Sequence, residues 1–162
     1  MHRRSIRHYA DRPVEPEKLD YILRCALTSP SAKRQNPWEF VVVTDPAKVH
    51  ELAACKTLGS NMLTTAQAAI AVVLNPNLLD TWQADGGIAA EQIMLAATEQ
   101  GLGSCWCHTL DRENAESFVR EKLGIPASLR VLCLIALGYR DEERQDYDLT
   151  KLLYDKIHYG KY

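Results

Sequence analysis

The stretch from residue 85 to residue 106, DGGIAAEQIMLAATEQGLGSCW, carries the strongest structural signal in the chain. Up to about Gln100 it is rich in Ala, Glu, Gln, Met and Leu, which are good helix formers. Gly101 and Gly103 then end the predicted helix. Apolar side chains occur almost all the way round it, which is typical of a helix at the centre of a domain or in a subunit interface.

Three apolar runs outside this helix predict buried strands: 39–44, 69–74 and 131–137. Helical patterns predict three further helices: about 16–29, 46–55 and 111–124, the last with Asp111 as its N-cap. Strands that are buried on both faces and separated by helices indicate an α/β layered fold.

The length of 162 residues predicts a single domain that spans residues 1–162. Hydrophobic residues make up 46% of the chain and charged residues 25%, which excludes a disordered or fibrous protein. The absence of a long apolar run excludes a membrane span, and the basic N-terminus lacks the apolar stretch of a signal peptide. We therefore expect a cytoplasmic protein, with no membrane partner.

The five cysteines are odd in number, and the one close pair, Cys105 and Cys107, is C-x-C. This pattern fits neither a disulfide framework nor a zinc site, so we expect reduced thiols, mostly in the core, and no metal. The segment 139–162 is polar with little periodicity but contains Tyr and Leu. It is predicted to be a C-terminal arm that packs across a surface or a partner.

The first chemical signal is Arg3-Arg4-Ser5-Ile6-Arg7. Three guanidinium groups and a hydroxyl within five residues can bind a phosphate, since arginine meets phosphate in bidentate geometry. The chain lacks the common nucleophile, zinc and nucleotide-loop motifs, so a bound organic cofactor is the simplest source of chemistry. The alternatives are a solvated basic tail, or a module without enzymatic activity that binds nucleic acid or anions. The net charge of −2 argues against nucleic acid.

The order and spacing of several segments resemble the nitroreductase family of FMN-dependent oxidoreductases. These segments are RRSIR at 3–7, SPSAKRQNPWEFVVV at 29–43, the stretch 85–106, ALGY at 136–139 and YDKIHYGKY at 154–162. The resemblance implies an α/β (α+β) fold with a central, mostly antiparallel sheet flanked by helices. It also implies a homodimer with FMN at the subunit interface, in agreement with the helix that is apolar on all sides.

The resemblance also implies the residues of the flavin site. Arg3 would hold the phosphate, and Arg7 would stabilise the negative charge of reduced flavin near N1. Asn61 would meet the pyrimidine part of the ring. The full set of expected cofactor-binding residues is Arg3, Arg4, Ser5, Arg7, Pro30, Ser31, Ala32, Arg34, Asn36, Asn61, Trp106, Cys107, His108, Arg144 and Lys151.

By this resemblance, NADH or NADPH delivers hydride to the flavin, and a nitroaromatic or quinone acceptor is then reduced at the same site. No side chain is needed as a nucleophile. Another flavin activity on the same fold, a reductive dehalogenase or a flavin-consuming oxidase, is an alternative.

The chain departs from the family pattern at a few positions. Arg34 stands where members usually have Asn, and Asn36 where they often have Gln; the extra cation could bind phosphate or attract an acidic substrate. Members often have a helix before the arginine motif, where this chain has Met1 and His2.

Several residues have structural interpretations beside the functional ones. Asn61 could cap a helix over 62–68, and Trp38 could be a core anchor. Trp106 could serve either role. We expect Cys105 and Cys107 to be buried without a role, His108 to be a hydrogen-bonded structural histidine, and the charges of 141–143 to be solvated.

Overall fold

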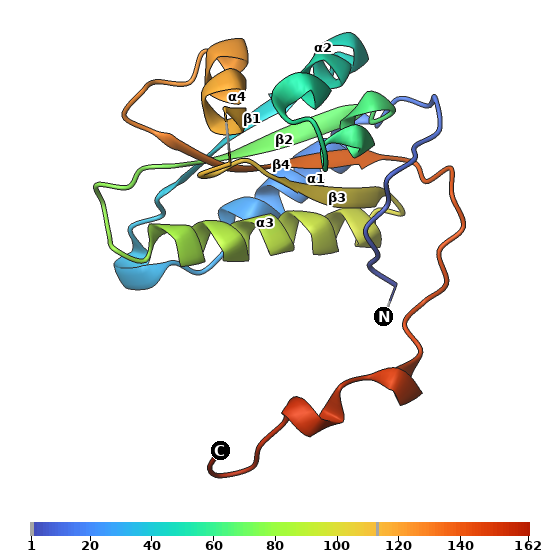
Figure 1. Ribbon diagram of the computed structural model, residues 1–162, viewed down its shortest axis with the longest axis vertical. Coiled ribbons are helices and arrows are strands. Elements are labelled where there is room, and N and C mark those ends of the chain that lie inside the picture. Colours follow the sequence, from blue (N-terminus) through green and yellow to red (C-terminus); the bar gives the residue numbers. More distant parts are fainter. Residues whose placement is uncertain (1, 113) are drawn as a thin grey trace.

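The computed structural model describes residues 2–112 and 114–162. Within them, an antiparallel sheet has the strand order β1-β2-β4-β3. Its strands are β1 (Trp38–Val43), β2 (Ala68–Leu74), β3 (Gly103–His108) and β4 (Arg130–Gly138). The helices are α1 (Pro16–Leu27), α2 (Pro46–Glu51), α3 (Trp82–Glu99) and α4 (Ala115–Leu123). Helices α1 and α3 cover one face of the sheet, and α2 and α4 the other (Figure 1). The predicted antiparallel α+β fold is therefore confirmed.

The central strands β2 and β4 explain the continuously apolar runs. Every residue of β2 is buried. Ile70 and Val72 belong to the core under α1 and α3, whereas Ala71 and Val73 belong to the core under α2 and α4. Successive side chains of a strand point to opposite faces, so a strand between two helical layers must be apolar at every position.

Helix α3 lies close against the sheet because its inner face is made of small residues. A Cβ on Gly86 would lie 2.5 Å from Cδ1 of Leu74, so a larger residue there would force the Leu74 side chain to shift. Ala89, Ala90 and Ala97 are fully buried, but Ile88 and Leu95 on the outer face remain 44% and 48% exposed. The expectation of a helix in the core is therefore confirmed for one side of α3, whereas the other side leaves an apolar stripe exposed in the single chain.

Two local predictions were wrong, and a third, the helix over 46–55, is confirmed except for its type after Glu51. Strand β3 was not predicted, because its sequence GSCWCH is mixed and lies at the edge of the sheet. Asp111 is not a helix cap: it has a left-handed backbone with φ of 52° and pairs with Arg130 at 2.7 Å, and Asn114 precedes α4 instead. The helix that begins at Pro46 changes to a 3-10 turn at Leu52.

The N-terminal arm, residues 2–9, lies along the outer edge of β3. Ser5 bridges Ser104 in parallel, and the N–H of Ile6 donates to the Ser104 carbonyl at 3.0 Å. A Cβ on Gly103 would lie 2.9 Å from the Ile6 side chain, so this glycine lets the arm approach. The arm thereby adds to an edge that would otherwise be open.

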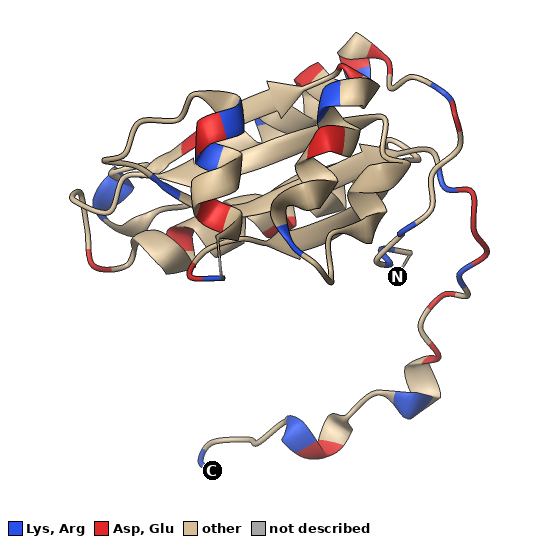
Figure 2. Ribbon diagram, turned by 45° about the horizontal axis from the view of Figure 1, so that its top comes forward, with Lys and Arg blue, Asp and Glu red and all other residues tan. Residues whose placement is uncertain are grey.

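The C-terminal arm leaves the body after β4 and runs away from it (Figure 1). Acidic and basic residues alternate along its first part (Figure 2). Residues 143–162 are all exposed and contain only two 3-10 turns, Leu149–Lys151 and Tyr154–Lys156. The first part of the arm lies beside residues 3–10 of the same chain, whereas the part beyond Tyr147 runs away from the body.

Candidate functional site

Side chains of the N-terminal arm alternate between two sides, as in any extended segment. His2, Arg4 and Ile6 face a cavity of about 420 Å³ beside the end of α3. Arg3 lies on α3 itself, with Nε 3.5 Å from a carboxylate oxygen of Glu91. The arginines of the motif are therefore distributed over two surfaces rather than gathered at one point.

The cavity is lined by several cations. Arg4, Arg140 and Arg144 face it together with His2 and Asp146, and Gly101–Gly103 form its wall. Asp146 is 2.7 Å from the His2 ring, and Arg144 is 2.9 Å from Glu142, so acids neutralise part of the charge. Such a set of guanidinium groups matches the oxygens of a phosphate.

Sequence reasoning expected Arg4 and Arg144 here but missed Arg140. Arg140 is placed by the antiparallel bridge between it and Tyr9, which joins the arm to the end of β4. Its position directly after the last apolar strand was the one available signal.

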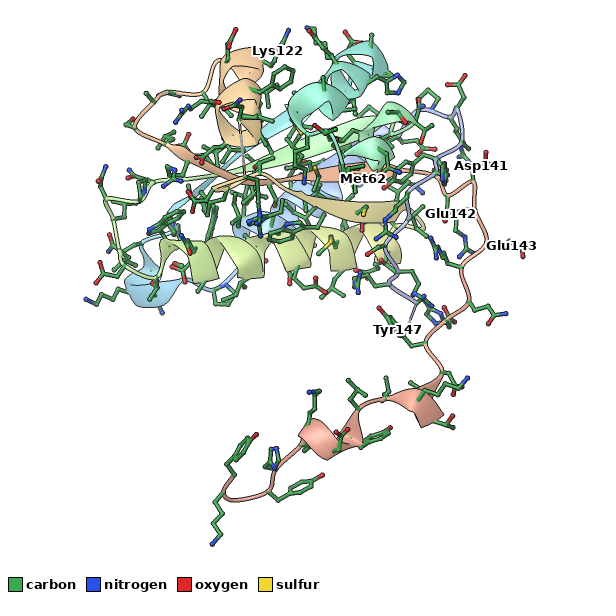
Figure 3. The ribbon with its side chains drawn as sticks, in the orientation of Figure 1. Met62, Lys122, Asp141, Glu142, Glu143 and Tyr147 are labelled. Carbon is green, nitrogen blue, oxygen red and sulfur yellow. The ribbon has the colours of Figure 1, made fainter. Side chains whose placement is uncertain are left out.

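Glu142, on the segment after β4, holds the N-terminal arm in place, contrary to the expectation that 141–143 are only solvated. Its carboxylate accepts hydrogen bonds from the backbone N–H groups of Arg7 and His8. Figure 3 shows Glu142 and Tyr147 on the strand-like segment that runs beside the arm. Partial burial opposes ionisation of Glu142, but the two backbone hydrogen bonds and Arg144 outweigh it and lower its pKa.

Tyr147 adds a second clamp. Its ring lies under the Arg4 guanidinium, with 4.5 Å from Cζ to the ring centroid, and its hydroxyl accepts from Arg3 at 3.4 Å. Arg4 also donates to the backbone carbonyl of Gln145. The start of the C-terminal arm therefore orients Arg3 and Arg4 of the motif.

The outer edge of β3 continues beyond the arm to Trp106, Cys107 and His108. Lys56 donates to the His108 carbonyl at 2.9 Å, and the Cys107 thiol donates to the carbonyl of Gly59 at 3.5 Å. The segment 56–61 thus borders the far half of β3, as the N-terminal arm borders the near half.

Asn61 lies at the end of this bordering segment, with an exposed side chain. It is the first residue of a 3-10 turn, Asn61–Thr64, and its carbonyl accepts from the Thr64 hydroxyl. Its side-chain amide forms no hydrogen bond with residues 2–112 or 114–162. The interpretation as a cap of a helix over 62–68 was wrong, since β2 already begins at Ala68. The exposed Asn61 amide lies near the edge of β3. Ser5 and the exposed Arg7 lie on the neighbouring arm.

His108 stacks on Trp106, with 6.2 Å between ring centroids and 19° between planes. Burial, with the nearby cations Arg112 and Lys56, lowers the pKa of His108. Within the part of the chain that the structure describes, its ring nitrogens form no hydrogen bond, so the expectation of a hydrogen-bonded structural histidine was wrong.

The thiols at this strand are not activated. Burial raises the pKa of Cys105, and a hydrogen bond to Cys55, together with burial, raises that of Cys107. Both side chains are at most 2% exposed. Protonated, buried thiols are poor nucleophiles, which agrees with the expectation that neither has a chemical role. Trp38, at 6% exposed, is a core residue as one interpretation held.

The expected flavin loop, residues 30–36, lies at the other end of α3 from the cavity. The Ala32 N–H donates to the carboxylate of Asp85, in the first turn of α3. Ser31 and Asn36 are hydrogen-bonded to each other, with 2.7 Å between the two side-chain oxygens. Pro30 and Arg34 are exposed. Within one chain, the loop 30–36 therefore does not reach the cavity lined by Arg4, Arg140 and Arg144.

Lys151, another residue expected to bind the cofactor, is exposed on the C-terminal arm and pairs with Asp148 at 3.2 Å. It does not line the arginine cavity, and the arm that carries it runs away from the body of the chain (Figure 1). Over residues 2–112 and 114–162 we find neither a cluster of metal-ligating side chains nor a helix long and apolar enough to cross a membrane.

Fold and site together define an α+β protein with a cavity at the edge of its sheet that is lined by Arg4, Arg140 and Arg144. A profile of the Nitroreductase family matches residues 1–71 and 56–139. The chain therefore belongs to the nitroreductase family of oxidoreductases.

Individual relatives agree. An FMN-dependent nitroreductase from Clostridium difficile R20291 is 42% identical, with a TM-score of 0.96 over 99% of this chain and 96% of that structure. A protein of Archaeoglobus fulgidus, provisionally named NADH dehydrogenase/NAD(P)H nitroreductase, is 38% identical over 99% of this chain and 94% of its own length. The structure of NADPH:FMN oxidoreductase from Vibrio harveyi, complexed with NAD+, is 25% identical, with a TM-score of 0.79 over 98% of this chain and 74% of its own.

Proposed function

We propose that this protein is an FMN-dependent oxidoreductase that takes hydride from NADH or NADPH and passes it to an electron-poor acceptor, a nitroaromatic or a quinone, in two successive half-reactions. The observation that carries the proposal is the cavity lined by Arg4, Arg140 and Arg144 beside β3, in a chain of this family. The names of the relatives from Clostridium difficile and Vibrio harveyi support FMN and a nicotinamide donor.

The residues present fit FMN by their donor chemistry. A phosphate monoester carries about −1.5 to −2 charges at neutral pH, which suits several guanidinium groups better than one. Arg4, Arg140 and Arg144 would hold the phosphate in the cavity that they line, and the edge of β3 from Trp106 to His108 would lie along the ring. Arg3 and Ser5 would contact FMN from the other surface of the N-terminal arm. Asn61 would hydrogen-bond the pyrimidine part, and Arg7 would place a fixed positive charge near N1. FMN, when bound, supplies the acceptor and donor of hydride.

A homodimer would complete this site. Helix α3 has 18 residues, and at 1.5 Å per residue it is about 27 Å long. The loop 30–36 lies at its start and the arginine cavity at its end. If the α3 helices of two copies pair in antiparallel orientation, the loop of one copy meets the arginines of the other. We propose that Pro30, Ser31, Ala32, Arg34 and Asn36 contact flavin in this way.

The uncovered apolar side chains support the same assembly. Ile88 and Leu95 form the outer stripe of α3, and the C-terminal arm exposes further large apolar residues: Leu149, Leu152, Leu153, Tyr154, Ile157 and Tyr159. Several large exposed apolar side chains on neighbouring turns of one segment are typical of an interaction site. The arm would then cover a second copy and bring Lys151 to that copy's site. Residues 1–162 would form one flavin-binding domain, with 139–162 as its C-terminal arm.

We also propose a cytoplasmic location. All five cysteines are free, and the buried Cys105 and Cys107 are protonated thiols. This is the state expected in a reducing compartment.

The test is the visible absorption spectrum of the purified protein under anaerobic conditions, before and after addition of NADH or NADPH. We expect flavin bands that bleach with at least one of the two donors and return when a quinone or nitroaromatic is added. A colourless protein that takes up no added FMN would contradict the proposal.

A further inference from the structure

Asp85 is a buried carboxylate with an unusually small set of partners. It is 4% exposed, and its two oxygens accept from one donor, the Ala32 N–H, at 3.3 and 3.2 Å. Among the described residues it forms no ion pair. Burying a carboxylate is unfavourable unless it is compensated, and here the amino end of α3 supplies only part of the compensation. An apolar side chain at position 85 would avoid this cost, so the carboxylate of Asp85 requires a specific explanation.

The loop that Asp85 contacts, residues 30–36, has an energetically unfavourable backbone conformation at three residues. Lys33, Arg34 and Asn36 all have left-handed conformations, with φ of 53°, 56° and 45°. For residues other than glycine this region is disfavoured, and such strain persists only where the surroundings fix it.

The loop is tied to the body at one point. Its other hydrogen bonds are internal. The Asn36 N–H donates to Ser31 Oγ at 3.0 Å, and the Ser31 hydroxyl donates to Asn36 Oδ1 at 2.7 Å. The Gln35 side-chain amide donates to the Lys33 carbonyl, and the N–H groups of Arg34 and Gln35 donate to the carbonyls of Ser31 and Ala32. In the described residues, the bond from Ala32 to Asp85 is the one hydrogen bond from residues 30–36 to the rest of the molecule. Figure 1 shows this loop beside the start of α3.

We infer that Asp85 is a positioning residue: its carboxylate fixes the strained loop 30–36 and thereby presents Ser31, Arg34 and Asn36 in a preformed shape to the flavin site. The first half of this inference concerns this chain alone. The second half rests on the proposed function.

Trypsin provides a test that needs no flavin, because the exposed Lys33 and Arg34 are cleavage sites within the loop. In Asp85→Ala we expect cleavage after these residues to be at least about tenfold faster, since loss of a hydrogen bond to a charged group shifts local opening by that order. Mass spectrometry identifies the fragments ending at 33 or 34. Asp80→Ala is the matched control: Asp80 is exposed, precedes the same helix and forms no hydrogen bond in the described residues. It should leave the cleavage rate unchanged.

Circular dichroism establishes that each variant is folded. If Asp85→Ala does not fold, Asp85→Asn decides, because the amide keeps an acceptor for Ala32 and loses the charge. We expect trypsin to cleave the loop of Asp85→Asn faster than the wild-type loop, but more slowly than a loop that has lost the hydrogen bond from Ala32. Cleavage at the wild-type rate in a folded Asp85 variant would overturn the inference.

Titration with FMN, followed by flavin fluorescence, tests the second half. We expect a roughly tenfold higher dissociation constant in Asp85→Ala, partial rescue in Asp85→Asn and no change in Asp80→Ala. A wild-type protein that binds no FMN would refute the proposed function and leave the proteolysis result standing. Faster cleavage with unchanged FMN affinity would overturn the positioning role alone.

Discussion

At the scale of single residues, the arginine motif is organised by groups that its own sequence does not contain. Arg4 is held by Tyr147 and the Gln145 carbonyl, and the backbone at Arg7 is held by Glu142. Arg7 itself keeps an exposed side chain. The motif therefore supplies the charges, while contacts with the segment after β4 fix the positions of the Arg4 side chain and of the backbone at Arg7.

Arg7→Ala should lower the reduction potential of bound flavin and slow its reduction by NADH or NADPH about tenfold, since a charge-assisted interaction with reduced flavin is lost. Potentiometry and stopped-flow absorbance measure the two effects. Arg24→Ala serves as control, because Arg24 is exposed on α1 and pairs with Asp20 at 2.8 Å. Unchanged potential and rate in Arg7→Ala would exclude the role we give to Arg7.

Glu142 makes the docking of the N-terminal arm depend on pH. Its pKa is lowered from 4.5 on folding, so it stabilises the folded protein above that pH and loses this effect as the pH falls through the folded value. We expect Glu142→Gln to unfold at a lower temperature than wild type at pH 7, with the difference shrinking below pH 4.5. Glu143→Gln, at the exposed neighbour, should match wild type throughout. A constant difference between Glu142→Gln and wild type across this range would be inconsistent with the assignment.

At the scale of elements, α3 joins the two halves of the proposed site and limits how the sheet can pack. Its small inner residues let it approach β2, its first turn carries Asp85, and its last turn borders the arginine cavity. The outer stripe with Ile88 and Leu95 is free to meet a second copy.

Two adjacent glycines of α3 give a matched test of this packing. Gly86→Ala should destabilise the protein by about 1–3 kcal/mol, because the new methyl group overlaps Leu74. Gly87→Ala meets no atom within 4 Å, and it should stabilise by about 0.5–1 kcal/mol through helix propensity. Chemical denaturation measures both. Equal effects of the two substitutions would show that α3 does not approach the sheet as described.

At the scale of the whole molecule, the end of the C-terminal arm, residues 149–162, is exposed along its whole length. Exposure of its large apolar side chains to water is unfavourable, and the proposed dimer would bury them. The same assembly brings the loop 30–36 and Lys151 to arginines that they do not reach within one chain.

Leu153→Glu should convert the dimer to a monomer, measured by sedimentation velocity, and should weaken FMN binding. Leu153 is 64% exposed in the single chain, so the substitution leaves the fold intact. Ala54→Glu is the control, because Ala54 is exposed on the 3-10 turn Leu52–Cys55, which packs on the opposite face of the sheet from α3. A Leu153→Glu protein that remains dimeric, or a wild-type monomer that retains flavin, would contradict the proposed assembly.

The elements with strong periodic or continuous apolar patterns were predictable. α3 and the central strands β2 and β4 follow from local composition, because burial on two sides leaves no room for polar residues. Strand β3 escaped prediction because an edge strand needs fewer apolar residues, and Asp111 was misread because its partner, Arg130, is 19 residues away.

For the site, sequence alone determined its chemistry: the arginine motif, the family resemblance and the expectation of a phosphate-bearing cofactor all rest on residue types in order along the chain. Only the tertiary structure decided which of those residues share a surface. It joined Arg4 and Arg144 with Arg140, gave Glu142 its role as a clamp, and placed the loop 30–36 beside Asp85 at the opposite end of α3. The physical reason is that charge and hydrogen-bonding capacity belong to each side chain, whereas distance depends on how the helices and strands pack.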